Sequence, residues 1–199
     1  MLLVAVTVTM LAADLWSKSW AFANVADAPV PLSRASAMEA DRLSDLLPAH
    51  EPIIVIPSVL EFTLVLNRGA VFGMAAGQRW FFVGFTAVAI VFCLWMFASW
   101  TRPKDRMAHI AIALVLAGGL GNLYDRLMFA CVRDFLHFLP GVELPFGIAW
   151  PGGEREVWPY VSNVADAQLI LGIAVLMWFS LRSPADESRD ETEAADAAS

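Results

Sequence analysis

The chain has 199 residues, of which 58% are hydrophobic and 17% are charged, and its formal net charge is −7. Its mean hydropathy of +0.60 is high for a soluble domain, in which apolar residues make up about half of the sequence. The negative charge gives no reason to expect a nucleic-acid partner, and several windows reach the roughly 20 apolar residues that cross a bilayer. The composition therefore predicts one compact integral membrane domain, which we place at residues 1–183.

Much of the negative charge lies in the last segment, residues 184–199. This segment contains no large apolar side chain, so we expect a disordered acidic tail. The two cysteines, Cys93 and Cys131, lie in or beside apolar segments and lack the spacing of metal ligands. Free buried thiols are therefore expected, and neither a disulfide nor a metal site.

The first apolar segment, residues 3–23, is predicted to be a retained transmembrane helix. A secretory signal peptide begins with basic residues, but no Lys or Arg precedes this run, and Asp14 and Lys18 interrupt it. These two residues share one helical face, with the acid on the N-terminal side, which favours an ion pair. Either the pair only neutralises itself within the membrane, or one of its members faces a polar cavity.

Residues 24–78 are predicted to form part of a cap outside the bilayer. The run 38–47 is compatible with a short amphipathic helix at the membrane surface. Residues 52–66 are rich in Ile and Val and alternate in polarity, which indicates extended structure. Glycines and Asn67 then indicate tight turns, and Asn67 is either only a turn residue or a polar contact to a ligand.

Two further spans are predicted at residues 79–100 and 107–129. The first has a Trp near each end, as expected at the two membrane interfaces, and three Lys or Arg residues lie in the loop 101–106. Excess positive charge places this loop in the cytoplasm. Glycines in the second of these spans allow close packing of helices.

A second cap segment is predicted over residues 136–160, because its Pro and Gly residues break any helix. The fourth span follows at residues 161–181 and ends before Arg182. Four spans with a cytoplasmic loop between the second and third place both termini in the cytoplasm. The predicted fold is an all-α membrane protein with four transmembrane helices and a small extracytoplasmic β or irregular cap.

Polar residues interrupt the third and fourth spans in the same pattern. Asn122 precedes Asp125 by three residues, and Asn163 precedes Asp166 by three, so each Asn shares a helical face with its Asp. Both pairs lie toward the outer ends of their helices, and Asp134 follows the third span. A charge at the bilayer centre costs about 2.5–3.5 kcal/mol, so this cluster is a candidate functional site.

These residues leave three interpretations of the polar cluster open. Nearby carboxylates share a proton in low dielectric, and then serve as general base and general acid, as in aspartic proteases. A transporter or channel subunit would relay protons or bind cations there, but the inner halves of the second and fourth spans are apolar. In a structural protein, Asp125 and Arg126 would pair with each other or with neighbouring residues, and only to fix helix packing.

The sequence gives no signal of a Ser–His nucleophile or of a catalytic metal site. The three histidines, His50, His109 and His137, are not clustered, and Ser162 has no sequence context of a Ser–His nucleophile. Neither an HExxH nor a CxxC spacing indicates a metal. No metal and no cofactor are therefore expected.

Four blocks of sequence, in this order, resemble the lipoprotein signal peptidase (signal peptidase II) family. They are DLWSK at 14–18, NRGAVFG at 67–73, GGLGNLYDR at 118–126 with VRDF at 132–135, and VSNVADAQ at 161–168. Each block alone is weakly specific, whereas the ordered set is highly specific. The resemblance implies an aspartyl endopeptidase of the bacterial inner membrane that removes signal peptides from diacylglyceryl-modified prolipoproteins, cutting before the lipidated Cys.

The resemblance also implies roles for particular residues. The catalytic dyad maps to Asp134 and Asp166, toward the outer face of the membrane. The supporting positions are Asp14, Lys18, Asn67, Gly69, Asn122, Asp125, Arg126 and Asn163. Prolipoprotein substrates and membrane lipid are the implied partners, and we expect a monomer.

The sequence departs from the family in its outer segments, which bear on substrate entry. Residues 24–56 and 136–160 are longer than usual, and Ser162 stands where Phe is common. A lipidated Cys and an apolar signal helix would arrive laterally, so an apolar groove with a polar end is expected between helices. Candidate acyl or interface contacts, which equally suit packing, are Phe72, Met74, Phe129 and Trp158.

Overall fold

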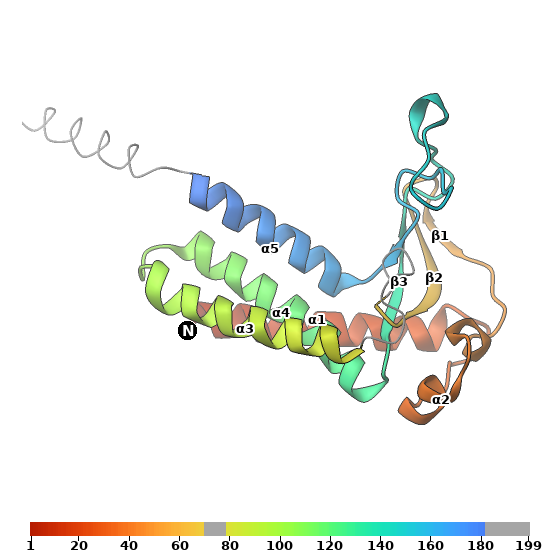
Figure 1. Cartoon of the computed structure of the whole chain (residues 1–199), viewed down its shortest axis with the longest axis horizontal. Coiled ribbons are helices and arrows are strands. Elements are labelled where there is room, and N and C mark those ends of the chain that lie inside the picture. The colour runs from red at the N-terminus through yellow and green to blue at the C-terminus, as the bar shows by residue number, and fades with distance from the viewer. Residues whose placement is uncertain (70–78, 182–199) are drawn as a thin grey trace, which may run out of the picture.

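The computed structural model describes residues 1–69 and 79–181. Its long helices are α1 (Leu2–Asn24), α3 (Arg79–Trp100), α4 (Arg106–Met128) and α5 (Val164–Leu181), which lie together as a bundle (Figure 1). All four are long and apolar enough to cross a membrane, and the predicted fold class is confirmed. The predicted tail, 184–199, and the candidate contacts Phe72 and Met74 lie outside the described residues.

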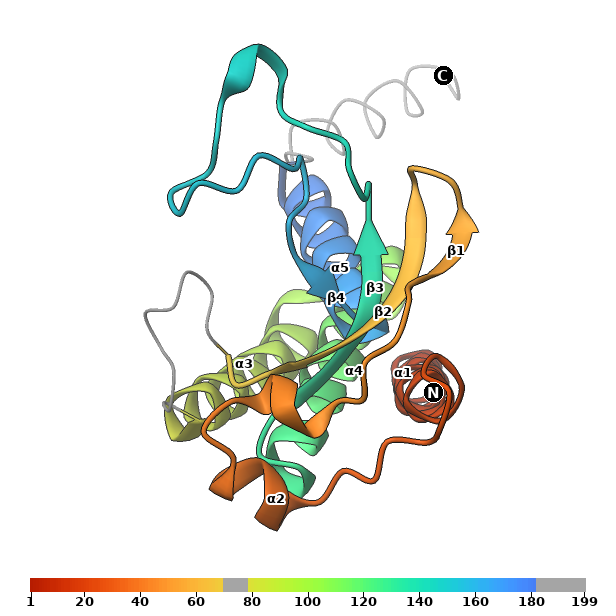
Figure 2. The ribbon, with the colours of Figure 1, turned by 90° about the vertical axis from the view of Figure 1, so that its right-hand side faces the viewer.

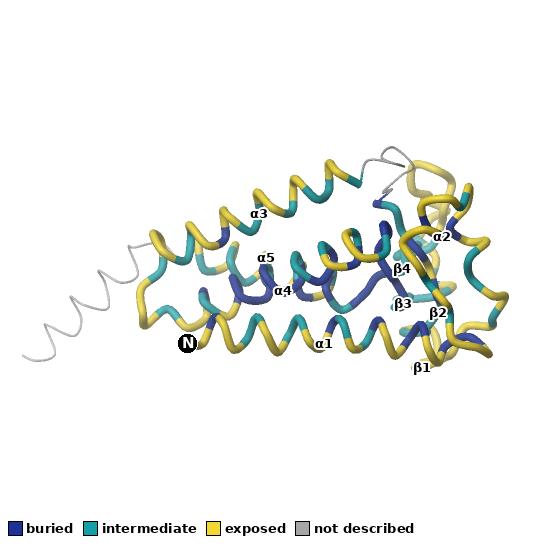
Figure 3. Tube along the Cα trace, turned by 90° about the horizontal axis from the view of Figure 1, so that it is seen from below, coloured by how far each residue is buried: buried dark blue, intermediate teal, exposed yellow. Residues whose placement is uncertain are grey.

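The cap lies at one end of the helix bundle. The N-terminus, the connection between α3 and α4, and the end of α5 lie at the opposite end (Figure 1). Seen from below, α3 diverges from the other helices toward the cap (Figure 3). At the far end the rings of Trp100 on α3 and Phe179 on α5 meet edge to face, with centroids 5.4 Å apart.

The cap is built on a four-stranded antiparallel sheet with the strands in the order of the chain. The strands are β1 (Ile53–Ile56), β2 (Leu60–Asn67), β3 (Val132–Phe138) and β4 (Val161–Ser162). The extended structure predicted over 52–66 is confirmed by β1 and β2. Viewed from the cap end, the sheet crosses the ends of α4 and α5 (Figure 2).

The amphipathic helix predicted over 38–47 is wrong. Two shorter elements occupy this region, α2 (Arg34–Glu39) and a 3-10 turn η1 (Leu43–Leu46). Leu43 is buried in the core of the cap, with Leu46 and Leu47 packed against the same cluster. The leucines that gave the run its apolar face are therefore used inside the protein, and the segment folds around them.

The helix α4 lies at the centre of the bundle. About 61% of the apolar 18-residue stretch of α4 is buried inside the protein, compared with 17% or less of the corresponding stretch in the other three long helices. Glycine allows its neighbours to approach closely: a Cβ added to Gly118 would lie 2.5 Å from the carbonyl oxygen of Ala165, and one added to Gly172 of α5 would lie 2.8 Å from that of Ala111. Small residues at helix contacts are a common basis of packing in membranes.

Adjacent glycines on α4 provide a test of this contact. Gly118→Ala should push α4 away from α5 and lower stability by about 1–3 kcal/mol, as overpacking commonly does. Gly119→Ala places its Cβ 3.6 Å from Thr86, an ordinary contact, and should be neutral or stabilising by up to about 1 kcal/mol. Thermal unfolding in detergent compares the two, and equal melting temperatures would contradict the packing argument.

Candidate active site

Side chains from three elements, and from the residue that precedes α5, converge where the bundle meets the sheet. Asp134 comes from β3 and is 2% exposed, and Asp166 lies in the first turn of α5. Asn122 comes from α4, and Asn163 directly precedes α5. Because β3 follows α4 and β4 leads into α5, the pairing of these two strands brings the polar residues together.

Asn163 and Asp166 cap the start of α5 reciprocally. The Asn163 side-chain oxygen accepts a hydrogen bond from the backbone N–H of Asp166 at 3.1 Å. One oxygen of Asp166 accepts from the backbone N–H of Asn163 at 3.1 Å. This is the geometry of a capping box, and it holds the carboxylate at the positive end of the helix dipole.

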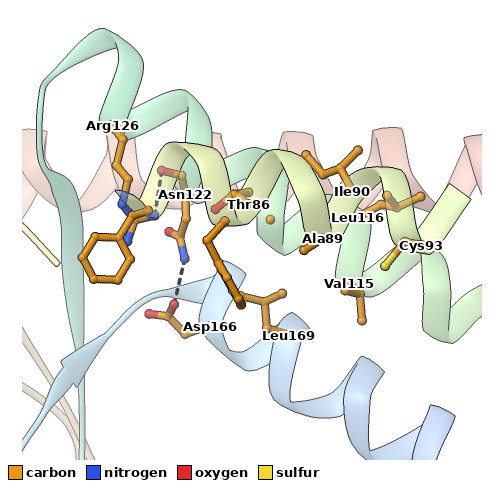
Figure 4. Close-up of a pocket in the computed structure, with 13 residues that line it drawn as sticks. Thr86, Ala89, Ile90, Cys93, Val115, Leu116, Asn122, Arg126, Asp166 and Leu169 are labelled. Atoms are coloured by element: carbon orange, nitrogen blue, oxygen red, sulfur yellow. Dashed lines mark hydrogen bonds between the residues drawn. The ribbon is translucent and has the colours of Figure 1, made fainter. Parts of the chain in front are cut away.

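Two amides link the two carboxylates. The Asn163 amide donates to Asp134 at 2.6 Å and to the side-chain oxygen of Asn122 at 3.2 Å. The Asn122 amide in turn donates to Asp166 at 2.8 Å (Figure 4). Asp134 and Asp166 therefore belong to one continuous hydrogen-bond network. This network holds each carboxylate in a fixed orientation.

Asp134 has a second amide partner on the neighbouring strand. Asn67 on β2 donates to its other oxygen at 3.2 Å, while the Asn67 side-chain oxygen accepts from the N–H of Gly69 at 2.7 Å. Asn67 is therefore a turn residue that also orients Asp134, and Gly69, at φ +97°, has a backbone conformation that favours glycine. Burial, reinforced by the charge of Asp166, raises the pKa of Asp134 to about 7.

Lys18 lies beneath this network and is fully buried. Its ammonium is 2.9 Å from Asp14, 3.0 Å from the side-chain oxygen of Asn122 and 3.7 Å from Asp125. The predicted pair of Asp14 and Lys18 is present, and it also faces the polar site. A side chain at Gly121 would collide with the Asp14 carboxylate, so only glycine fits there.

Asp125 pairs with Arg133 of β3 and not with Arg126. Arg133 donates to it from Nη2 at 2.8 Å and from its backbone N–H at 3.0 Å. Sequence reasoning missed Arg133; its only signal was its place beside Asp134 in the VRDF block. Arg126 donates to the backbone oxygen of Asn122 at 3.2 Å and lies over the Phe82 ring at 5.1 Å.

A cavity of about 230 Å³ opens between α3, α4 and α5 (Figure 4). Its polar end is formed by Asn122, Arg126 and Asp166. The remaining lining is mostly apolar and consists of Phe82, Phe85, Thr86, Ala89, Ile90, Cys93, Val115, Leu116, Gly119 and Leu169. The arrangement matches the expected apolar groove with a polar end.

The other two candidate contacts do not line this cavity. Phe129 lies under the guanidinium of Arg133 at 4.5 Å, and Trp158 meets Tyr160 edge to face at 6.2 Å. Both cysteines are free and buried, as expected. Within residues 1–69 and 79–181, no group of three or more His, Cys, Asp or Glu is placed to hold a metal ion.

Comparison with known proteins gives a consistent set of relatives. The sequence pattern of signal peptidase (SPase) II matches residues 6–182. The lipoprotein signal peptidase of Sinorhizobium fredii is 38% identical over 158 residues, which cover 75% of this chain and 84% of that protein. The one from Azoarcus sp. is 35% identical over 136 residues, covering 66% and 68% respectively.

Solved structures share the fold. Two structures of a bacterial membrane enzyme, at 2.3 and 1.9 Å resolution, each superpose with a TM-score of 0.63 and 22% sequence identity. They cover 90% and 91% of this chain and 87% and 93% of their own chains.

The raised pKa of Asp134 makes the stability of the folded chain depend on pH. This pKa is about 7 in the folded chain and about 4 in an unfolded one, so the folded state binds the extra proton between these values. Relative to Asp134→Asn, the free energy of unfolding of the wild-type chain should therefore fall by up to about 1.4 kcal/mol per pH unit as pH rises from about 4 to about 7. Thermal unfolding in detergent measures the difference.

The exposed Asp41 provides a matched control for this measurement. Asp41→Asn should keep the wild-type dependence on pH between about 4 and about 7, because its carboxyl is not buried. An Asp134→Asn protein with the same slope as Asp41→Asn would contradict the assigned pKa.

Proposed function

This chain belongs to the signal peptidase II family, and we propose that Asp134 and Asp166 are the catalytic dyad of this aspartic peptidase. Family membership makes it a hydrolase of the lipoprotein-processing pathway that acts on prolipoproteins. One observation carries the assignment of the dyad: a single amide network joins Asp134 to Asp166, and Asp166 lines the polar end of an apolar groove.

The different environments of the two carboxylates assign their roles. Asp134 is buried and has a pKa of about 7, so it holds the shared proton and acts as the general acid. Asp166 lines the groove and is oriented by two N–H donors at the start of a helix, so we assign it the role of general base. Such a division between two carboxyl groups is the usual basis of aspartic-protease chemistry.

The reaction then proceeds without a covalent intermediate. Asp166 takes a proton from water as the water oxygen attacks the scissile carbonyl carbon, and Asp134 gives its proton to the carbonyl oxygen. Asp166 next passes its proton to the amide nitrogen, the C–N bond breaks, and Asp134 recovers a proton from a hydroxyl of the intermediate. The products are a carboxylic acid and an amine, and the dyad returns to its starting state.

The groove accounts for an apolar substrate that arrives from the bilayer. Its walls come from α3, α4 and α5, and its polar end contains Asp166. We propose that the apolar signal segment of a diacylglyceryl-modified prolipoprotein lies in this groove and that the bond before the lipidated Cys reaches the dyad. We propose that the enzyme acts as a monomer.

The basic loop between α3 and α4 gives the orientation in the membrane. Arg102 and Lys104 lie at the end of the bundle opposite the sheet, and the positive-inside rule places them in the cytoplasm of the bacterial inner membrane. The dyad then faces the outer side, where the lipobox of a translocated prolipoprotein is found, and the N-terminus lies inside.

Replacing either member of the dyad tests the proposal directly. Asp134→Asn and Asp166→Asn should each lower cleavage of a diacylglyceryl-modified lipobox peptide by about 10²–10⁴-fold, because each removes a general acid or base. Asp41→Asn is the control and should cleave at the wild-type rate. Normal processing by Asp166→Asn, with the protein folded, would refute the dyad.

Filling the groove tests the substrate path. Ala89 lines the groove, and the adjacent Val88 is 69% exposed on the outside of the bundle. Ala89→Phe should raise KM for the lipidated peptide by about tenfold, since a bulky ring displaces the apolar segment. Val88→Phe should leave KM unchanged, and equal effects of the two changes would argue against this path.

A further inference from the structure

A chain of buried charges connects α5 to β3 beneath the amide network. Its members are Asp14 and Lys18 of α1, Asp125 of α4 and Arg133 of β3, and we call them the charge chain. Three of them are fully buried, and Arg133 is 6% exposed. Their charges alternate in sign and sum to zero, which is the condition under which buried charges are tolerated.

One end of the charge chain holds the first turn of α5. Asp14 accepts the backbone N–H of Ala165 at 2.8 Å and binds Lys18 at 2.9 Å. Lys18 lies 3.7 Å from Asp125 and completes the connection to α4. Ala165 directly precedes Asp166 in the sequence.

The other end holds β3 by both its main chain and its side chain. Arg133 donates its backbone N–H to one Asp125 oxygen at 3.0 Å, and its Nη2 to the other oxygen at 2.8 Å. Its Nε lies 3.2 and 3.3 Å from the two oxygens. A guanidinium that contacts both oxygens of a carboxylate is held in direction as well as in distance.

We propose that Arg133 is a positioning residue that, through Asp125, holds Asp134 at its working distance from Asp166. The proposal rests on the proposed dyad. One end of the charge chain, Arg133, directly precedes Asp134, and the other end, Asp14, binds the backbone N–H of the residue that directly precedes Asp166. A displacement of about 1 Å between catalytic groups can lower a rate about 10²-fold.

A purely structural role for Arg133 makes a different prediction. If the ion pair only stabilised the fold, its loss would lower the melting temperature but leave the folded enzyme with its normal kcat and pH profile. A positioning role requires that kcat and the pH profile change in protein that is still folded.

The experiment compares Arg133→Lys and Arg133→Gln with a control in the full-length enzyme. Arg133→Lys keeps the positive charge beside Asp125 but loses the two-point contact, so it should fold. Arg155→Lys is the control, because Arg155 pairs with Glu143 at 3.2 Å on the surface of the cap. The readouts are kcat, KM and the pH profile for the lipidated peptide, with the melting temperature in detergent.

For Arg133→Lys we expect kcat to fall by about 10–100-fold with KM within twofold. We also expect the loss of activity on the alkaline side to move to lower pH, because a carboxyl group farther from Asp166 gives up its proton more easily. Arg133→Gln should be less stable and at least as slow, and Arg155→Lys should match the wild type.

Folded Arg133→Lys with unchanged kcat and pH profile would overturn the inference, as would a lowered melting temperature as its only effect. A different result would contradict the proposed function. If Asp134→Asn and Asp166→Asn retain activity, then the dyad is wrong, whatever the Arg133 variants do.

Discussion

The amide side chain of Asn163 connects the two halves of the site. Its oxygen caps α5 through the N–H of Asp166, and its nitrogen donates to Asp134 on the sheet at 2.6 Å. A carboxylate buried where a bundle meets its cap is costly unless its oxygens are hydrogen-bonded. The Asn163 amide donates one such bond to Asp134, and the Asn163 backbone N–H donates another to the Asp166 carboxylate at 3.1 Å. The orientation of each acid therefore depends on the position of the other element.

The sheet and the helices contribute to this meeting in different ways. The pairing of β3 with β4, in which Leu136 lies opposite Ser162, sets the segments that carry Asp134 and Asn163 side by side. Close packing of α4 on α5 at Gly118 then sets how deep the first turn of α5 lies. The catalytic geometry thus depends on the strand register, which sets Asp134 beside Asn163, and on the helix packing, which sets the depth of α5.

The residues that a local pattern could reveal were predictable from the sequence. The spacing of four between Asp14 and Lys18 predicted an ion pair on one helical face, and this pair is present. The spacing of three between Asn163 and Asp166 predicted a shared helical face, whereas α5 begins at Val164 and Asn163 caps it from outside. Arg133 was not predictable in this way. Its contact with Asp125 requires the chain to reverse between α4 and β3, where Ala130 adopts a φ of 60°, and no periodicity encodes that reversal.

The cap differs from the site in how its polar contacts are arranged. His137 lies between Glu61 at 2.8 Å and Glu156 at 3.2 Å, and Glu156 also accepts the N–H of Gly141. These bonds fasten the long segment 139–160 to the sheet, and they share no residue with the amide network or the charge chain. Asp134 and His137 lie on the same strand, but one is almost fully buried and the other is partly exposed. The outer segment can therefore vary in length and sequence while the groups around Asp134 stay fixed, because separate sets of interactions hold the two regions.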